Sequence, residues 1–401
     1  MSPFERLVHV FDRHSPLHFT LVAEFPVPLD AARLRAALAA VWERHPLPAA
    51  RITREPGRAP VLHPPAAGTP PALTLVDGDP AGWRTLAAEE MARRLPTADG
   101  ALHRAVLLSS ADASTLLLTL DHSVADGVGA AVVLADLVAA LNGHPPRPLP
   151  APPSRETLFD RLPPPSHEPL PAPPVPASAP RRALRPFDGV PPHVSTAALD
   201  RPSTARLRAR CRADGVTVQA ALVTAATRAR AVLRAEDTVA RTLTPVDLRP
   251  LLGVTGGCAA HFGHARTAST PRPDLTFREH VRATAVDLAA ARDPAVLAAA
   301  SAHCRREVPA CPTEAEALAI GRRTLDHELI VTNLRTLPPH APGPVRVRAV
   351  WGPITLCRLD GEEVLGVVTH EGGMRLTACS HEDSARALPH RVAELLAAYA
   401  P

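Results

Sequence analysis

Apolar residues recur along the chain with two different spacings, and each spacing predicts a different secondary structure. A stripe from Leu29 to Trp42 has the spacing of one helix face, with Asp30 placed to cap the helix and Pro46 placed to end it. Shorter apolar runs are typical of strands, and the run at 114–120 is so uniformly apolar that it should lie in the centre of a sheet. The first 144 residues are therefore predicted to form helices at 30–45, 81–95 and 128–141 and strands at 103–108 and 114–120.

A change in composition divides the chain into two parts. Eighteen of the 47 prolines fall within residues 145–192, where large apolar residues are few. Proline fixes its own φ and removes a backbone donor, so this segment is expected to be extended or irregular and to connect two lobes. Both lobes, at 1–144 and 193–401, are predicted to be of the α/β (α+β) class. The elements predicted for the second lobe are helices at 204–213, 217–233 and 384–399 and strands at 238–244, 329–332, 345–350, 364–369 and 374–380.

Composition and charge argue against several classes of protein. All 44 basic residues are arginine, the net charge is only +4, and no basic run alternates with aromatic residues, so nucleic-acid binding is unsupported. The longest apolar stretch, Val128 to Leu141, is interrupted by Asp136 and is too short to span a bilayer. The N-terminus lacks the apolar core of a signal peptide, so a cytoplasmic location is expected. The six cysteines show no C-x-x-C spacing, which favours reduced thiols and argues against zinc or another bound metal.

The segment with the clearest chemical meaning is DHSVADG at 121–127, between the apolar strand and the helix that follows. A histidine on the first loop residue after a central strand is held rigidly, and its ordinary pKa near 6.5 leaves it largely neutral and basic at cytosolic pH. Asp126 can hold the loop through a charge-assisted hydrogen bond, and Gly127 allows a sharp turn into the helix. His122, Asp126 and Gly127 are therefore the candidate catalytic residues. The alternative is a structural histidine beside an aspartate that caps the helix.

This His-x-x-x-Asp-Gly segment resembles the active-site signature of a superfamily that includes the condensation domains of nonribosomal peptide synthetases, polyketide-associated acyltransferases, plant BAHD acyltransferases and chloramphenicol acetyltransferase. The early position of the motif, with a second lobe after it, is similar to that of the two-lobed monomeric members rather than the trimeric ones. The resemblance implies two chloramphenicol acetyltransferase-like lobes with a tunnel between them. The other segments that carry it are RHPLPAAR at 44–51, GVTV at 215–218, DLRP at 247–250, Phe262-Gly263 and VTNL at 331–334.

The resemblance also implies a reaction. His122 would act as a general base while an acyl group passes directly from a thioester to a hydroxyl or amine on a small-molecule acceptor. The thioester would be acyl-coenzyme A or a phosphopantetheinyl group on an acyl-carrier protein, with no resident cofactor. An ion pair between Asp126 and Arg249 is implied as well, although a solvated turn residue is the alternative for Arg249. Further candidates for lining the tunnel or binding substrate are Ser123, His261, His264 and Asn333, and surface-loop positions are the alternative for the two histidines.

Three positions depart from the pattern of the condensation domains. Asp121 stands where the first of two adjacent histidines is usual, His264 stands in place of an asparagine, and Arg335 replaces a glycine. The first departure favours ester or amide formation by a free-standing, monomeric acyltransferase of polyketide, nonribosomal peptide or lipid biosynthesis over peptide condensation. Two other functions stay open: a condensation-like scaffold that binds a carrier protein without turnover, and a hydrolase or cyclase that acts on a tethered intermediate.

Overall fold

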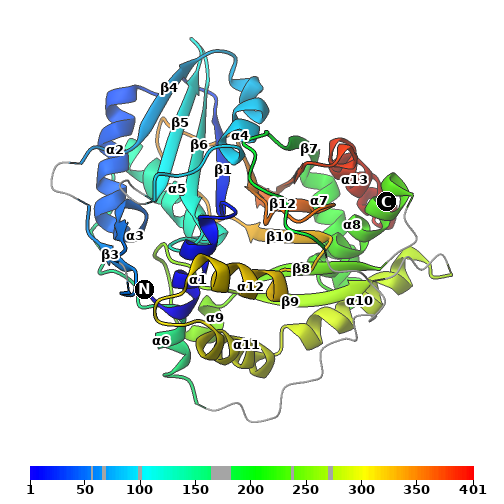
Figure 1. The fold of residues 1–401 in the computed structure, drawn as a ribbon. Coiled ribbons are helices and arrows are strands. Elements are labelled where there is room, and N and C mark those ends of the chain that lie inside the picture. Colours follow the sequence, from blue (N-terminus) through cyan, green and yellow to red (C-terminus); the bar gives the residue numbers. More distant parts are fainter. Residues whose placement is uncertain (56, 66–68, 98–101, 164–181, 236–238, 270–273) are drawn as a thin grey trace.

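The strand expected at the centre of a sheet lies there. The computed structural model describes residues 1–55, 57–65, 69–97, 102–163, 182–235, 239–269 and 274–401. In it, Ser114–Asp121 (β6) has an antiparallel neighbour on each side, and all eight of its residues are buried. The first sheet has the order β11-β1-β6-β5-β4, formed by Ala349–Thr355 (β11), His18–Phe25 (β1), β6, His103–Ser109 (β5) and Leu73–Asp77 (β4) (Figure 1).

A second, six-stranded sheet is built from the C-terminal half of the chain. Its central strand β10 pairs in parallel with both of its neighbours, whereas the outer pairs are antiparallel. A small hairpin joins Arg51–Thr53 (β2) to Val61–His63 (β3). The second sheet has the order β7-β13-β12-β10-β8-β9, formed by His193–Leu199 (β7), Gly373–Ser380 (β13), Glu363–His370 (β12), Leu329–Thr336 (β10), Ala240–Asp247 (β8) and Phe262–Ser269 (β9).

Helices cover the faces of both sheets (Figure 1). Ala31–Arg44 (α2) and Gly127–Leu141 (α5) pack against the first sheet, and Val218–Arg234 (α8) and Leu388–Tyr399 (α13) pack against the second. No helix among the described residues is long and apolar enough to cross a membrane. The other helices are Pro3–Asp12 (α1), Pro46–Ala49 (α3), Trp83–Met91 (α4), Arg155–Phe159 (α6), Arg201–Ala213 (α7), Arg249–Leu252 (α9), Phe277–Ala291 (α10), Pro294–Glu307 (α11) and Glu314–Thr324 (α12), with 3-10 turns at Pro80–Gly82 (η1) and Asp383–Arg386 (η2).

One strand from the C-terminal part of the chain belongs to the first sheet. β11 pairs antiparallel with β1, with Thr355 opposite Phe19 and Ala349 opposite Glu24. The prediction that residues 193–401 form one separate lobe is therefore wrong for this strand, which is also displaced from the predicted range of 345–350. An apolar run does not specify which sheet edge its strand joins, because both edges offer the same backbone groups.

The two sheets touch where β11 passes β12. Gly366 of β12 lies so close to β11 that a Cβ at this position would overlap the carbonyl oxygen of Pro353. A shared apolar cluster crosses the contact, with Val22 from the first sheet and Leu243 and Val364 from the second among its members. The separation of the two sheets is therefore fixed by packing.

The proline-rich segment also contains regular structure. α6 begins after Ser154, whose side chain accepts a hydrogen bond from the N–H of Thr157, and Leu158 is buried. The expectation that 145–192 would hold no helix is wrong here, because a capping serine precedes several residues without proline. Residues 164–181 of this segment, and Thr238 at the start of one predicted strand, lie outside the described residues.

Candidate active site

The loop at 121–127 runs from the end of β6 to the start of α5 and is held at both ends. The N–H of His122 donates a hydrogen bond to the carbonyl oxygen of Leu17 at 2.9 Å. The side chain of Asp126 caps α5 by accepting from the N–H of Gly129 at 2.7 Å. His122 therefore stands on a fixed turn between a central strand and a capped helix.

His122 presents one defined ring nitrogen to its surroundings. Its Nδ1 lies 3.0 Å from the carbonyl oxygen of Ala125, and since a carbonyl can only accept, Nδ1 carries the proton and Nε2 of the neutral ring does not. The ring lies between Phe19 and Phe262, at centroid distances of 4.6 and 5.1 Å. Burial lowers the pKa of His122 below its ordinary value of 6.5, against smaller opposing effects of Ala125 and Asp126. The ring is therefore neutral at pH 7 and can accept a proton at Nε2.

Asp126 is occupied by hydrogen bonds that hold the loop. Its Oδ2 accepts from Nη1 of Arg249 at 2.8 Å, and its Oδ1 accepts from Nη2 at 3.0 Å, which is bidentate geometry. Oδ2 also accepts from the backbone N–H of His261 at 3.0 Å. Arg249 is buried, so it is not the solvated turn residue that was its alternative. Asp126 thus ties the motif loop to the second half of the chain, and its place in the site is that of a positioning residue.

Gly127 serves close packing rather than an unusual backbone angle. A Cβ at this position would lie 2.6 Å from Cδ2 of Leu334 and 3.0 Å from Cγ of Pro353. Its φ is not among the positive ones, so the turn does not require glycine for its backbone conformation. The interpretation of Gly127 as a residue that permits a sharp turn is therefore corrected: it lets β10 and β11 approach the start of α5.

Asp121 and Ser123 bond to each other inside the protein. Oδ1 of Asp121 accepts from the N–H and the hydroxyl of Ser123 at 2.8 and 2.5 Å, and both residues are completely buried. Ser123 therefore does not line the cavity. Burial and, to a smaller extent, the charge of Asp121 raise the pKa of buried Asp12, and burial raises the pKa of Asp121. Asp121 is fully buried, bonds to Ser123 and is not among the residues that line the cavity, so it does not replace the missing histidine as a second base facing substrate.

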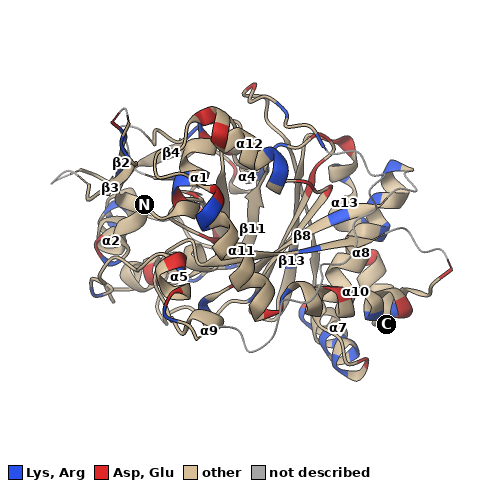
Figure 2. Ribbon diagram, turned by 60° about the horizontal axis from the view of Figure 1, so that its bottom comes forward, with Lys and Arg blue, Asp and Glu red and all other residues tan. Residues whose placement is uncertain are grey.

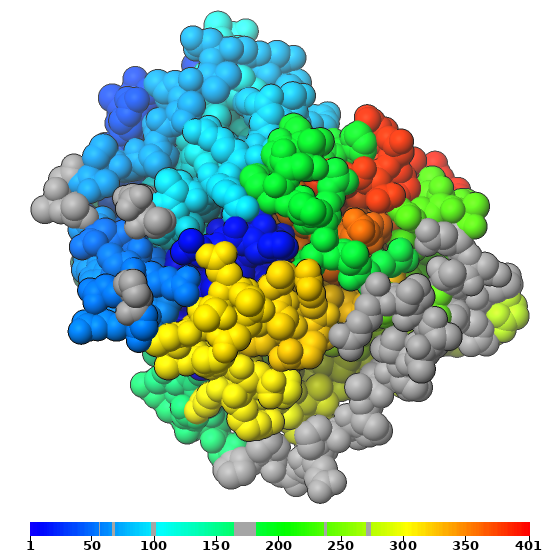
Figure 3. Space-filling view, viewed as in Figure 1, coloured from blue at the N-terminus to red at the C-terminus, as the bar shows by residue number. Residues whose placement is uncertain are grey.

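A cavity of about 1080 Å³ adjoins His122. Its wall includes Phe19 and Thr355 from the first sheet and Phe262 and Ile330 from the second. Parts of α1, α11 and α12 cover one side, where α1 (dark blue) lies against the two yellow helices (Figure 3). The volume is near the upper end of ordinary small-molecule sites, roughly 300–1000 Å³, which is enough for two substrates that meet at one base.

The two candidate histidines of β9 and the loop before it have different positions. His264 lines the cavity, and burial, followed by the charge of Arg266, holds the pKa of His264 well below its ordinary value, so the ring is neutral. His261 points elsewhere, because its Nε2 lies 2.9 Å from the carbonyl oxygen of Pro153. The structure therefore brings His122 and His264 to one cavity and leaves the ring of His261 outside it.

Asn333 lines the cavity at the end of β10, next to residues that sequence reasoning missed. Its Oδ1 accepts from the backbone N–H of Arg335 at 2.8 Å, which shapes this end of the strand. Arg208 and Arg292 also line the cavity and lie near this strand, since Arg208 bonds to Thr336 and the charge of Arg335 acts on Arg292, and Arg266 lines the cavity from β9. Arginine is the only strong cation in a chain that has 44 of them, so no sequence signal separates these residues from surface ones.

Two cysteines line the cavity, but neither is an activated nucleophile. Burial raises the pKa of Cys304 and Cys357, so both stay protonated at neutral pH. Cys357 also belongs, with His327 and Glu362, to a group whose potential metal-ligating atoms lie within 4.8 Å of one another. Glu362 accepts from the backbone N–H groups of Cys357 and Arg358 at 3.0 and 2.8 Å, and its other oxygen lies 2.8 Å from Nε2 of His327. These hydrogen bonds use the lone pairs that a metal would need, so the group stabilises the turn at 357–362.

Comparison with known proteins finds similar folds but no matching family model and no matching curated sequence. Among solved structures, polyketide synthase associated protein 5 from Mycobacterium tuberculosis matches 97% of this chain and 96% of its own, with a TM-score of 0.63 and 16% identity. The first condensation domain of the CDA synthetase matches 100% and 96%, with a TM-score of 0.65 and 17% identity. The epimerization domain from the third module of tyrocidine synthetase B matches 100% and 95%, with a TM-score of 0.64 and 13% identity. The likeness confirms the predicted fold: the chain has the two-lobed, chloramphenicol acetyltransferase-like fold of the condensation domains.

Proposed function

We propose that this protein transfers an acyl group from a thioester to a hydroxyl or amine acceptor, with His122 as the general base. One observation carries the proposal: Nδ1 of His122 is held in its protonated form by the carbonyl of Ala125, so the basic Nε2 is the nitrogen left to act in the cavity. A histidine fixed in this tautomer, and kept neutral by its low pKa, is suited to accept a proton from an attacking nucleophile.

The proposed reaction has two proton transfers through the same nitrogen. The acceptor O–H or N–H gives its proton to Nε2 of His122 as the acceptor atom bonds to the thioester carbonyl carbon. When the C–S bond breaks, the imidazolium returns the proton to the departing thiolate. Help of this kind supplies roughly 10²–10⁴ in rate, and placing both substrates in one cavity adds to it. Cys304 and Cys357 take no part, because their thiols are protonated.

A basic mouth of the cavity supports a donor that carries phosphate. Arg208, Arg292 and Arg335 line this mouth, and none of the three has a carboxylate partner among the residues that the structure describes. α7, which carries Arg208, contains five arginines and no acidic residue (Figure 2). Burial and the neighbouring charge of Arg335 lower the pKa of Arg292, as expected for cations that lack a counter-ion. Both coenzyme A and a phosphopantetheinyl arm would bring phosphate oxygens to such a group.

Arg335 gives a second reason to regard this mouth as a binding feature. Its φ is 62°, a left-handed conformation that costs a residue with a Cβ about 1 kcal/mol. The backbone is held there by the hydrogen bond to Asn333. Glycine would avoid the strain. We infer that the exposed arginine side chain offsets it by binding an anionic part of the donor.

Thiol release with defined thioesters tests the proposal and separates it from its alternatives. The protein would be incubated with acyl-coenzyme A and acyl-pantetheine, with and without a panel of alcohols and amines, and free thiol and acylated product would be measured. Acyl transfer predicts product that depends on the acceptor and is lost in His122→Ala. Thiol release without acceptor would indicate a hydrolase. Binding without any release, unchanged in His122→Ala, would indicate a scaffold that does not turn over.

A further inference from the structure

Arg266 is a cation inside the cavity without a carboxylate partner among the described residues. It stands on β9, its side chain lines the cavity, and burial lowers its pKa. The carboxylate that acts on it most, Asp326, is bound by Arg241 at 2.8 Å. The neighbouring ring of His264 is neutral and supplies no negative charge. Arg266 is exposed and lines the cavity, so its positive charge is accessible to water and to an anion that enters the cavity.

Arg266 differs from most of the buried arginines of the chain in two ways, because it is exposed and has no carboxylate partner among the described residues. Five of the six buried arginines among the described residues reach a carboxylate within about 3 Å, as expected because a buried charge without a counter-ion is costly, and the sixth, Arg358, donates to the carbonyl oxygen of Met91. The five pairs are Arg104 with Glu90 at 2.6 Å, Arg155 with Glu156 at 2.9 Å, Arg230 with Glu363 at 3.0 Å, Arg241 with Asp326 at 2.8 Å and Arg249 with Asp126 at 2.8 Å.

The position of Arg266 relates it to the proposed base. Phe262, His264 and Arg266 alternate along β9 and all line the cavity, so they point to the same side of the strand. The ring of Phe262 lies 5.1 Å from that of His122. Four residues of strand place the backbone of Arg266 about 13 Å beyond that of Phe262. A substrate whose reacting atom lies at His122 could thus reach Arg266 with its far end.

We propose that Arg266 binds a carboxylate at the far end of one substrate, and that the protein thereby selects an anionic substrate over a neutral one. The inference rests on the proposed acyl transfer and adds the chemical class of one reactant. A single guanidinium offers a two-pronged donor that matches one carboxylate. The phosphate of the donor would instead meet the three arginines of the basic mouth. The carboxylate belongs either to the acyl group or to the acceptor.

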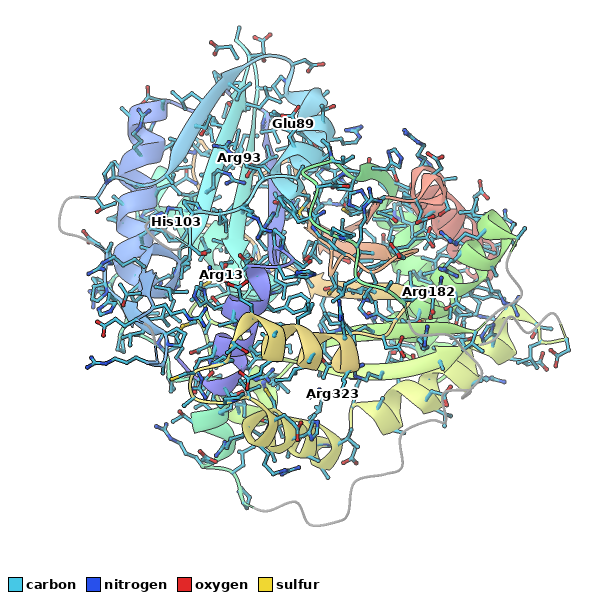
Figure 4. The ribbon with its side chains drawn as sticks, in the orientation of Figure 1. Arg13, Glu89, Arg93, His103, Arg182 and Arg323 are labelled. Carbon is cyan, nitrogen blue, oxygen red and sulfur yellow. The ribbon has the colours of Figure 1, made fainter. Side chains whose placement is uncertain are left out.

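Paired probes that differ in one charge distinguish the two sources. Hexanoyl-pantetheine and adipoyl-pantetheine differ by a terminal carboxylate on the acyl side, and 4-(hydroxymethyl)benzoate and its methyl ester differ on the acceptor side. Binding would be measured by calorimetry and turnover by thiol release, with wild-type protein and with Arg266→Gln. Arg323→Gln is the matched control, because Arg323 lines the same cavity from α12 (Figure 4) but has Glu307 as a partner at 3.4 Å.

The expected result is a preference for the charged member of one pair, about tenfold or more in Kd, that disappears in Arg266→Gln and persists in Arg323→Gln. Equal binding of both members of each pair by the wild type would overturn the inference, as would a preference that survives in Arg266→Gln. The two proposals fail separately. Charge-selective binding without thiol release would contradict the proposed acyl transfer but support the anion site. Equal turnover of neutral and charged probes would support the acyl transfer but contradict the anion site.

Discussion

Both carboxylate oxygens of Asp126 accept hydrogen bonds from the guanidinium of Arg249, at 2.8 and 3.0 Å, although the two residues are 123 positions apart in the chain. One partner caps the helix that follows the motif loop, and the other is the first residue of α9, just after β8 of the second sheet. The pair therefore holds the loop of the proposed base against the opposite lobe. This assignment makes stability, rather than chemistry alone, the property to measure.

Removal of either partner is expected to destabilise the protein. Asp126→Ala leaves buried Arg249 with Asp247 as its carboxylate partner, at 3.2 Å, and Arg249→Ala leaves the carboxylate of Asp126 buried without a cation, so each should lower the free energy of unfolding, by up to about 3–5 kcal/mol. Denaturant unfolding of the two single variants and the double variant measures this. The double variant should lose much less than the sum, because the pair acts as a unit. An Asp126→Ala protein that is inactive but as stable as the wild type would instead indicate a chemical role for this carboxylate.

The pH dependence of acyl transfer should report the ionisation of His122. The base must be unprotonated, and burial lowers the pKa of His122 from its ordinary value of 6.5, so kcat/KM should be flat near neutrality and fall only below that ordinary value. His122→Ala should lose roughly 10²–10⁴ in kcat while it keeps the melting temperature of the wild type. A wild-type profile that falls already between pH 8 and 7 would contradict the low pKa.

The buried carboxyl groups of Asp12 and Asp121 should make the protein less stable as the pH rises. Asp12 gives up its proton near pH 4 when unfolded but at about pH 8 when folded, so the folded state binds more protons between these values. The contribution of Asp12 to stability is thus complete below pH 4 and is lost as the pH rises to 8. Asp12→Asn retains an oxygen for the N–H of Leu17, which the aspartate binds at 2.7 Å, and does not titrate.

Unfolding of Asp12→Asn at several pH values checks this direction. The variant should be more stable than the wild type at pH 8, by on the order of 2 kcal/mol, and the difference should shrink toward pH 4. The control is Asp112→Asn, because Asp112 is exposed in a loop and its replacement should leave the wild-type pH dependence unchanged. Parallel curves for the wild type and Asp12→Asn would show that Asp12 is ionised in the folded state at neutral pH.

Arg335 should show opposite effects on stability and on donor binding. Arg335→Gly relieves the left-handed φ of 62° and is expected to stabilise the protein by up to about 1 kcal/mol. The same change removes a cation of the basic mouth, so the affinity for acyl-coenzyme A should fall roughly tenfold. Arg335→Gln is the matched variant, because it removes the charge and keeps the strain. Equal affinity of wild type and both variants would show that the donor phosphate does not meet this mouth.

Local pattern predicted the elements whose stability is local. β6 and α5 were placed within one residue of their observed ends, because an uninterrupted apolar run and a capped, alanine-rich helix are distinctive in the sequence. No element was predicted for 262–328, which holds β9 and α10 to α12. α11 illustrates why: its many alanines give a weak periodicity, and its place depends on contacts with α1 and β9. Such contacts join segments that are far apart in the chain.

The candidate site also combines features that local sequence predicts with features that only the folded structure shows. The motif at 121–127 was evident as a short run of residues, and the ion pair between Asp126 and Arg249 followed from resemblance. Ser123 and the ring of His261 were placed wrongly in the cavity, because a loop sequence does not show which side chains turn inward. No local sequence pattern marks Arg266. What distinguishes it is a missing counter-ion, and that property exists only in three dimensions.

The insertion of β11 beside β1 has a consequence for how ligands come and go. β11 comes from the C-terminal part of the chain and completes the first sheet, so it links the two lobes. The close contact between Gly366 and Pro353 holds this link in place. Separating the two lobes would break the pairing of β1 with β11 and expose the unpaired backbone groups of a sheet edge. A fragment that ends at the proline-rich segment would lack β11, so β1 would be an unpaired edge strand. Substrates are therefore expected to reach His122 without separation of the two sheets.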